Sequence, residues 1–465
     1  MEIIYNGPKK IRCRHADMSF PGCDITETLN PSQKTDIEHK KRKGKIKKPK
    51  MEFITKDKAE LEKGLPVSLV TLTNLFSQDL PDGTILFEFP STSNKGLRFV
   101  NDEKFLVYDF PPPTAYKNEY LLPLRACPVA GNKLPLLLSG YPSKSLEDHW
   151  NKWVPGYEEP VIKPISEIQE CDRIVTSFPH QKIPSSKHAV DPQVHYWLLS
   201  KGCIPHMGAN HPQYMTTDNY TLPCMVKAAH GTGTKGTFKV ETKQEMERVL
   251  EKMDNNLKNC QAPVITEVIE GITGNNCLQF YLYKSGEIHW LGVTNQIFGD
   301  NFIWGGGVVN WGDQTRLKSL LYDKVVPVKE YLHKQGYFGI VGIDILTTKD
   351  NSYIIDVNPR INGSTPQLLL APVMATLGYN TSVYLAGGRF NCKADKLLQT
   401  ANLINSQHSA MVIVLSLADV ENGCEAHVVA FGKTEKIAWD AANGLRPDLN
   451  EQNEETLKYH GEVQP

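Results

Sequence analysis

Residues 342–360 read GIDILTTKDNSYIIDVNPR, and the order of apolar and polar residues in this stretch decides the interpretation of the chain. Two short apolar runs, one around Asp344 and one ending at Asp356, flank a polar turn, which predicts a β-hairpin. Asp344 and Asp356 would then face each other on paired strands, and Asn358 would share a face with Asp356 because strand side chains alternate. Oxygen ligands of this kind beside Arg360 suit Mg²⁺ held together with substrate phosphates. The alternative is that these acids are ordinary strand-end residues in contact with water.

A second motif, CMVKAAHGTGTKGTFKV, occupies residues 224–240. It places Lys227 at the end of an apolar run, followed by a loop that contains Gly231, Gly233 and Gly236. A loop of this kind can turn consecutive backbone N–H groups toward one anion, and a lysine adds a point charge for a phosphate oxygen. The motif therefore indicates a phosphate-binding loop.

The context of the glycine loop argues against three better-known phosphate loops. A dinucleotide-binding loop opens a helix, whereas residues 237–240 have the composition of a strand. A Walker loop continues with Lys-Ser or Lys-Thr, and a kinase loop precedes its lysine and is followed by H-R-D and D-F-G. Neither arrangement is present. A strand–loop–strand hairpin over phosphates and an ordinary hairpin turn remain as the two interpretations.

Three further segments complete the pattern. Residues 263–271, PVITEVIEG, predict a strand that ends in acid and glycine, and residues 277–283 and 288–293 predict a hairpin. The order of lysine strand, glycine loop, hinge strand, hairpin and D…DVNPR over residues 185–370 resembles the ATP-grasp superfamily of carboxylate–amine ligases, of the amino-acid or peptide ligase type. The upstream Lys187, followed by a helical stretch and a predicted strand at 202–205, resembles the lead-in of that family.

The resemblance implies a role for each motif. For ATP binding it implies Lys187, Lys227, Gly231, Gly233 and Gly236 at the phosphates, and Glu267, Val268 and Ile269 at the adenine edge. It also implies Glu270 as a further ATP-binding residue, with Glu270 or an asparagine as the alternatives at the ribose. For Mg²⁺, with Mn²⁺ as a substitute, it implies Asp344, Asp356 and Asn358, and for catalysis Arg360, which would stabilise a negatively charged intermediate. The stretch after Glu270 contains no acid, so no single residue is assigned to the ribose.

The function that the resemblance implies is an ATP- and Mg²⁺-dependent carboxylate–amine ligase. It would activate a carboxylate as an acyl phosphate and join it to an amine, with amino acids or small peptides as substrates and with a homodimer as a further expectation. Two alternatives stay open. One is a non-catalytic ATP-binding sensor or scaffold with the same fold. The other is a carboxylase-like enzyme that activates bicarbonate, although no biotin-carrier lysine motif is present.

Length and composition predict the organisation of the chain. Its 465 residues, 40% hydrophobic and 22% charged, suit a globular α/β protein with α+β elements and two to four packed parts. The expected parts are a basic tail at 1–50, an N-terminal α/β domain at 51–184, an ATP-grasp module at 185–388 and a β-rich segment at 389–465. The module would divide into a glycine-loop part at about 190–265 and a metal-binding part at about 266–388.

Local patterns predict the remaining elements. Strands are expected at 68–72, 84–89, 105–110, 136–138 and 172–176, and again at 409–417 and 425–431. Residues 365–387 have a helical, apolar pattern, and Thr434 is a plausible N-cap of a final helix. The glycine-rich stretch 298–311 predicts a mobile substrate-binding loop, or alternatively a packed surface loop.

The basic run KKRKGKIKKPK at residues 40–50 predicts a solvated linker or a tag for nuclear import or polyanion binding. A nucleic acid or an import factor would bind through this tail alone, because the net charge of the chain is only −1. The ten scattered cysteines suit a reducing compartment, so the expected location is cytoplasmic, with the nucleus as an alternative. No apolar run is long enough to predict a membrane span.

Overall fold

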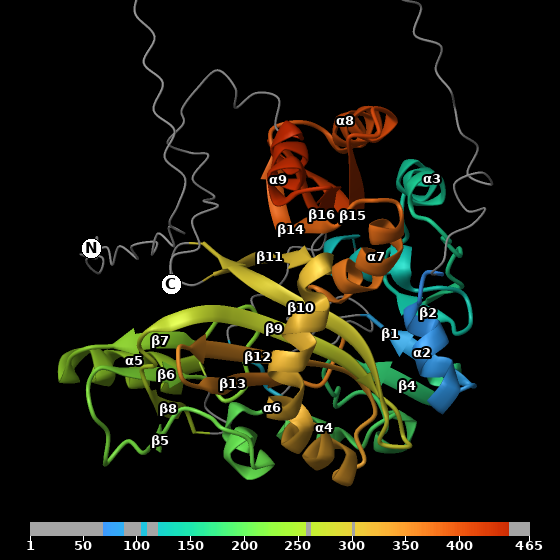
Figure 1. Cartoon of the computed structure of the whole chain (residues 1–465). Helices are drawn as coiled ribbons and strands as arrows, with labels where there is room; N and C mark the ends of the chain where they lie inside the picture. The colour runs from blue at the N-terminus through green and yellow to red at the C-terminus, as the bar shows by residue number, and fades with distance from the viewer. Residues whose placement is uncertain (1–67, 88–103, 109–119, 257–261, 300–302, 446–465) are drawn as a thin grey trace, which may run out of the picture. The chain divides into compact units, whose positions relative to one another are not determined.

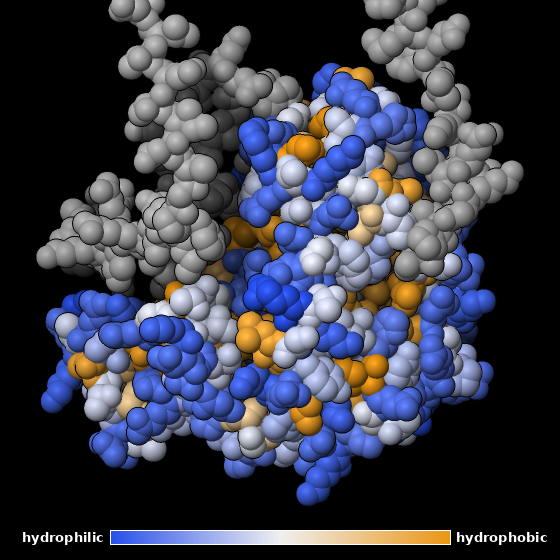
Figure 2. All heavy atoms as spheres, in the orientation of Figure 1, coloured by the Kyte–Doolittle hydropathy of each residue, from blue (hydrophilic) through white to orange (hydrophobic). Residues whose placement is uncertain are grey.

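The computed structural model describes residues 68–87, 104–108, 120–256, 262–299 and 303–445. The expectations for the basic tail at 1–50 lie outside the described residues. None of the helices in the described part of the chain combines the length and the apolar character needed to span a membrane. The face seen in Figure 2 is mainly hydrophilic, with hydrophobic patches scattered between polar side chains.

Helices and strands follow one another along the chain as drawn in Figure 1. The α-helices are α2 (Leu72–Asp79), α3 (Lys144–Trp153), α4 (Pro192–Leu198), α5 (Lys243–Asn256), α6 (Gln314–Lys334), α7 (Thr365–Thr376), α8 (Ala394–Ser406) and α9 (Glu435–Gly444). The strands are β1 (Gly83–Leu86), β2 (Leu136–Leu138), β3 (Ile162–Pro164), β4 (Arg173–Thr176), β5 (Tyr214–Met215), β6 (Cys224–Lys227), β7 (Thr237–Val240), β8 (Val264–Glu267), β9 (Ile272–Leu282), β10 (Ile288–Phe298), β11 (Trp304–Asn310), β12 (Gly339–Thr348), β13 (Ser352–Asn358), β14 (Thr381–Phe390), β15 (Ala410–Val420) and β16 (Gly423–Gly432). Short 3₁₀ helices are η2 (Leu124–Val129), η3 (Ile165–Glu170), η4 (Ser185–Lys187), η5 (Lys201–Met207) and η7 (Trp311–Asp313).

The first sheet has the strand order β3-β2-β1-β4, and all its strands are parallel. Ile85 and Leu136, which are partners across β1 and β2, are both fully buried, as expected for a parallel sheet with both faces covered. The strands predicted at 84–89, 136–138 and 172–176 are confirmed over their described residues.

Two other strands predicted in this part of the chain are wrong. The stretch 68–72 leads into helix α2, because the Thr71 hydroxyl accepts a hydrogen bond from the Asn74 N–H at 3.2 Å and so caps the helix. Residues 104–108 of the expected strand 105–110 are irregular, and the rest of that stretch lies outside the described residues. In both places β-branched or aromatic composition was a poor guide to the backbone conformation.

The second sheet has the order β5-β8-β6-β7 and is antiparallel. Helix α5 packs against it through the buried side chains of Met246 and Met253, which join Val226 and Ile265 in one apolar cluster. The predicted strands at 224–227 and 237–240 are confirmed. This sheet presents the glycine loop between β6 and β7.

The third sheet is the largest, with the order β13-β12-β9-β10-β11-β14-β16-β15, and every neighbouring pair is antiparallel. Its two faces bury different helices, because successive strand residues point to opposite sides. Phe280 packs in the same cluster as Leu321 of α6, whereas the next residue, Tyr281, joins Leu368 of α7. The predicted strands at 409–417 and 425–431 and the Thr434 cap are confirmed in β15, β16 and α9.

Two expectations about the third sheet are wrong. The stretch predicted as a mobile or packed loop at 298–311 contains strand β11, and the helix predicted over 365–387 ends at Thr376, after which β14 begins at Thr381. Glycine in β11 allows this strand to approach β14 closely, because a Cβ on Gly306 would lie 1.9 Å from the Tyr384 carbonyl oxygen. The expected boundary at residue 388 falls inside β14, and the division into domains stays a prediction.

Candidate active site

The β12–β13 hairpin brings the predicted acids together. Asp344 is the direct partner of Asp356 in the strand register, and Gly342 is the partner of Asn358. The structure therefore confirms the predicted hairpin and the position of the two acids opposite each other on its strands. On the other side of β12, Asp344 is also the partner of Cys277 on β9, so the acid lies between two strands rather than at a free edge.

Burial and the facing charge of Asp356 raise the pKa of the Asp344 carboxyl. Two carboxylates that repel each other in a partly buried site favour a cation, and with Asn358 they supply the hard oxygen ligands that Mg²⁺ prefers. Among the described residues no three His, Cys, Asp or Glu side chains form a closed metal site. The donor set therefore fits a cation that also takes oxygen ligands from a bound phosphate.

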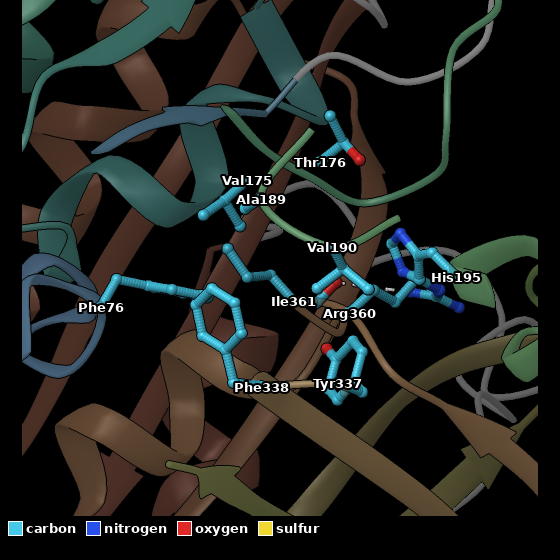
Figure 3. A pocket seen from close by; sticks show the side chains of 10 residues that line it. All are labelled: Phe76, Val175, Thr176, Ala189, Val190, His195, Tyr337, Phe338, Arg360 and Ile361. Atoms are coloured by element: carbon cyan, nitrogen blue, oxygen red, sulfur yellow. Dashed lines mark hydrogen bonds between the residues drawn. The ribbon is translucent and has the colours of Figure 1, made fainter. Parts of the chain in front are cut away.

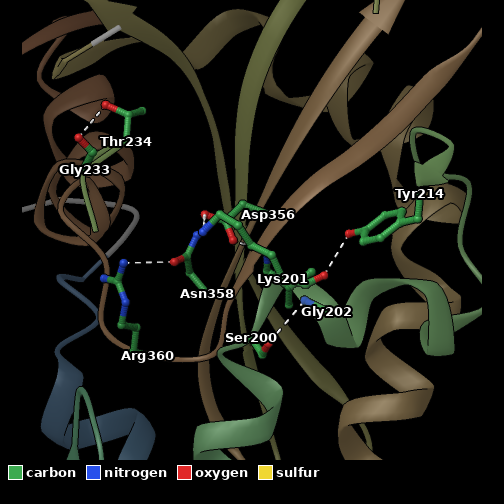
Figure 4. A network of polar contacts seen from close by, with 10 residues as sticks. Ser200, Lys201, Gly202, Tyr214, Gly233, Thr234, Asp356, Asn358 and Arg360 are labelled. Carbon is green, nitrogen blue, oxygen red and sulfur yellow. Dashed lines mark hydrogen bonds and ion pairs between the residues drawn. The ribbon is translucent and has the colours of Figure 1, made fainter. Parts of the chain in front are cut away.

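Lys201, at the start of η5, contacts Asp356 of this acid pair and was not singled out from the sequence (Figure 4). Its Nζ lies 3.1 Å from Oδ2 of Asp356, and both side chains are largely buried, at 11% and 20% exposure. The other oxygen of Asp356, Oδ1, accepts a hydrogen bond from the Val357 N–H at 3.1 Å. Both oxygens of this carboxylate therefore have partners.

The stretch 202–205 beside Lys201, predicted as a strand, belongs to the 3₁₀ helix η5. The predicted phosphate ligand of the same lead-in, Lys187, lies on η4, where its ammonium group donates to the carbonyl of Gln169. Its contact with phosphate stays a prediction. Lys201 is the lysine of this lead-in for which the structure gives a contact with Asp356.

Lys227 ends strand β6 and is only 8% exposed. Burial, together with the like charge of Lys201, lowers the pKa of its ammonium group to about 8, while Asp356 and Asp344 act in the opposite direction. The four charged groups are thus close enough to influence one another. This places the lysine of the glycine-loop sheet beside the acids of the largest sheet.

The glycine loop connects β6 to β7, so the strand–loop–strand hairpin is confirmed, and both interpretations of its role stay open. The loop backbone is left-handed at Gly233, Thr234 and Gly236, with φ of 57°, 66° and 75°. A Cβ on Gly231 would lie 2.6 Å from the Lys235 carbonyl oxygen, so the turn is tight at that point as well. The function of this loop as a phosphate lid stays a prediction.

The expected adenine segment follows the second sheet directly. Strand β8 ends at Glu267, whose Oε1 accepts a hydrogen bond from the Gln213 N–H at 2.8 Å. Val268 and Ile269 come after the strand and are partly exposed, and Glu270 is exposed. Their contact with adenine stays a prediction.

Arg360 connects the acid pair to a small cavity. Its Nη2 donates to Oδ1 of Asn358 at 2.9 Å, and its guanidinium lies 5.3 Å from the ring centre of Phe178. Burial lowers the pKa of Arg360. Figure 3 shows the same side chain at a cavity that is otherwise mostly apolar, with Phe338 and Tyr337 among its walls.

The loop that carries Arg360 is held by its neighbours. His195 on α4 makes a hydrogen bond through Nε2 to the Pro359 carbonyl at 2.8 Å, and Asn362 donates through Nδ2 to the Arg360 carbonyl at 2.6 Å. The Asn362 side chain also lies flat against Gly342, where a Cβ would approach it to 2.6 Å. The position of Arg360 relative to the hairpin is therefore fixed from two sides.

Comparison with known proteins gives one family match and several similar structures. Residues 207–358 match the family described as "L-aspartate–L-methionine ligase, ATP grasp". An ADP complex of N5-carboxyaminoimidazole ribonucleotide synthetase is 13% identical, with a TM-score of 0.45, covering 69% of this chain and 92% of that one. The same enzyme from Thermus thermophilus is 12% identical, with a TM-score of 0.44, covering 67% and 91%. Biotin carboxylase from Campylobacter jejuni, in a β-γ-ATP complex, is 11% identical, with a TM-score of 0.42, covering 66% and 83%.

Similarity at this level says nothing about the substrate of this chain. The family match is more informative, because its residues include the glycine loop, the hinge segment and both strands of the acid-bearing hairpin. These are the motifs whose arrangement the structure confirms. The match of residues 207–358 to an ATP-grasp ligase family therefore supports the resemblance to ATP-grasp carboxylate–amine ligases.

Proposed function

We propose that the protein is an ATP-dependent ligase that joins the carboxylate of one amino acid or small peptide to the amine of another. The observation that carries this proposal is the pairing of Asp344 with Asp356 beside Lys201, Lys227 and Arg360. Such a cluster of buried, opposed charges is suited to a highly charged phosphate ligand rather than to structural support.

In this proposal the binding of ATP is divided between two sheets. Lys227 and the backbone N–H groups of the loop at 231–236 hold the phosphates, and the backbone at 267–270 meets the adenine edge. When Mg²⁺ is bound by Asp344, Asp356 and Asn358, it offsets charge on the phosphate oxygens. The protein contributes position and charge, and no side chain is needed as a covalent nucleophile.

The reaction has two steps. A carboxylate oxygen of the first substrate attacks the γ-phosphorus of ATP, the bond to the β-phosphate oxygen breaks, and ADP leaves. The nitrogen of the second substrate then attacks the acyl carbon, phosphate leaves, the nitrogen gives up a proton, and an amide remains. Arg360 holds negative charge on the acyl phosphate, and closure of the glycine loop keeps water from hydrolysing it.

The choice of amino acids rests on the matched family, which is named for a ligase of L-aspartate and L-methionine. These two amino acids are therefore the first pair to test. The cytoplasmic location, the homodimer and the role of the basic tail stay predictions.

The test uses the full chain with ATP and Mg²⁺ in four parallel reactions: L-aspartate with L-methionine, pools of other amino acids, bicarbonate, and no acid. ADP release would be measured by a coupled assay and the product by mass spectrometry. We expect ADP release that depends on an amino acid, an amide product, and a hydroxamate when hydroxylamine replaces the amine. Tight ATP binding with neither product would favour the sensor alternative, and turnover with bicarbonate alone would favour the carboxylase alternative.

A further inference from the structure

We propose that Lys201 is a displaceable cation: its ammonium group neutralises Asp356 until the metal–nucleotide complex binds, and then moves to a phosphate oxygen. The identity of the nucleotide rests on the proposed function. The competition between Lys201 and a metal for Asp356 does not, because it follows from the ion pair alone.

The two partners of Asp356 differ in mobility. The Val357 N–H that binds Oδ1 belongs to the next residue of the same strand and stays with it. The Lys201 ammonium group that binds Oδ2 lies at the end of a flexible four-carbon side chain. A metal ion that approaches Asp356 therefore competes with Lys201, and the lysine is the partner that can leave.

The backbone of Lys201 is fixed, so only its side chain can move. Its N–H donates to the Ala229 carbonyl at 2.8 Å, and its carbonyl accepts from the Tyr214 hydroxyl at 2.8 Å. The Ser200 hydroxyl caps the same turn through the Gly202 N–H at 3.2 Å (Figure 4). Because Ala229 follows Lys227 by two residues, Lys201 is attached to the base of the glycine loop. A side chain that leaves Asp356 stays beside the expected phosphate site.

The need to keep buried charges paired explains why Lys201 would exchange Asp356 for a phosphate oxygen. A largely buried ammonium group without a counter-ion is costly, and so is a buried carboxylate. Transfer of the ammonium group to a phosphate oxygen as a metal takes its place on Asp356 keeps both groups paired before and after binding.

A purely structural role for Lys201 makes a different prediction. If the lysine only fixes the orientation of Asp356, its removal weakens metal binding and nucleotide binding together. If it is a displaceable cation, its removal strengthens metal binding in the absence of nucleotide and weakens nucleotide binding. The two roles therefore predict opposite changes in metal affinity when Lys201 is removed.

The experiment compares the full-length protein with Lys201→Met, Lys201→Gln and Lys201→Arg. The matched control is Lys239→Met, which removes a lysine–carboxylate pair of 2.7 Å on the neighbouring strand β7. Mn²⁺ binding without nucleotide would be measured by electron paramagnetic resonance of free Mn²⁺, and ATP binding in the presence of Mg²⁺ by calorimetry. We expect Lys201→Met and Lys201→Gln to bind Mn²⁺ roughly tenfold more tightly and ATP roughly tenfold more weakly, the size expected for one charge-assisted hydrogen bond.

Lys201→Arg should keep nucleotide binding close to that of the natural protein, because it keeps the charge, and Lys239→Met should change neither affinity. Weaker Mn²⁺ binding in folded Lys201→Met and Lys201→Gln would overturn the proposal in favour of the structural role, and so would unchanged affinities. If no ligase substrate is found, the Mn²⁺ measurement still decides this proposal. Its failure and the failure of the proposed function are therefore separate results.

Discussion

The two ends of the eight-stranded sheet bury polar side chains with different results. At the β15 end, Asn405 of α8 donates to the Val412 carbonyl at 2.9 Å and accepts from the Val412 N–H at 2.6 Å. At the β13 end, Asp344 and Asp356 carry like charges on paired strands. The first arrangement satisfies neutral groups and fixes a helix to a strand. The second leaves charge that a ligand can balance, and this difference separates structural from functional polar burial.

The largest effect is expected from a substitution at the charged β13 end of the sheet. Asp356→Asn removes one carboxylate with little change in volume and should lower turnover by roughly 10²- to 10³-fold or more, as for other groups that act on charge in the transition state. Turnover would be measured as Mg²⁺-dependent ADP release. The matched control is Asp350→Asn, which changes an exposed acid in the turn of the same hairpin. Undiminished ADP release in Asp356→Asn would refute the metal assignment.

The next largest effect is expected from a substitution at the neutral β15 end of the sheet. Asn405→Ala leaves the N–H and carbonyl of Val412 without their side-chain partner, which should lower the free energy of unfolding by about 2–4 kcal/mol. Activity per folded molecule should stay unchanged, because Asn405 has no part in the proposed site. Urea denaturation would measure the loss, with Gln407→Ala, an exposed neighbour, as control. A specific loss of activity at full stability would contradict the contrast between the two ends.

Lys227→Met should lower ATP affinity without lowering the free energy of unfolding, which separates the functional charge from structural support. ATP affinity, measured by calorimetry, should fall by roughly 10- to 100-fold, the range for a charged hydrogen-bond donor. The free energy of unfolding should not decrease, because burial already disfavours the charge of this lysine, whose pKa falls to about 8. Unchanged ATP affinity would make Lys227 a structural residue.

Acid should weaken both ends through buried histidines. Burial lowers the pKa of His149, near β15, and of His195, which contacts the Pro359 carbonyl just after β13, to about 4 in each case. In the folded state these groups bind fewer protons than in the unfolded state, whose pKa is about 6.5. Their stabilising effect is therefore complete above about pH 6.5 and is lost as the pH falls toward 4. The raised pKa of Asp344 acts in the opposite direction over the same range, so urea midpoints between pH 7.5 and 4.5 would be measured in the Asp344→Asn variant, where a flat profile would contradict the decline.

The smallest effect is expected at the surface. The Lys144–Asp148 pair on α3 is 2.7 Å long, but its side chains are 80% and 61% exposed. Lys144→Ala should leave the free energy of unfolding nearly unchanged, because solvent screens such pairs. Thermal melts in low and high salt would measure this. A change as large as that of Asn405→Ala would mean that the contrast does not depend on burial.

The sequence predicted the parts of the fold that local patterns determine. The hairpin around Asp344 and Asp356 and the two strands around the glycine loop follow from short alternating runs and turn residues. Strand β14 was missed because the apolar pattern of α7 continues toward it, and β11 because its glycines suggested mobility. Both strands depend on pairing with distant residues, which a local pattern does not contain.

The candidate site shows the same division. Lys227, Asp344, Asp356, Asn358 and Arg360 were predicted from motifs, and the structure brings them together. Lys201 was missed because its contact is with an acid far along the chain, and its neighbours Gly202 and Cys203 suggested only a strand. One signal could have drawn attention to it, namely a lysine next to an apolar segment that the fold must bury.

The central strand β11 also limits how this sequence can vary. A Cβ at Gly306, where φ is +133°, would overlap the carbonyl of Tyr384, and one at Gly307 would lie 2.2 Å from the Thr294 methyl group. Neither position can accept even alanine without moving a paired strand. Over evolutionary time, substitutions should accumulate in the surrounding surface while both positions keep glycine. A collection of related sequences should therefore show glycine at both positions, including members whose substrate-binding residues have diverged.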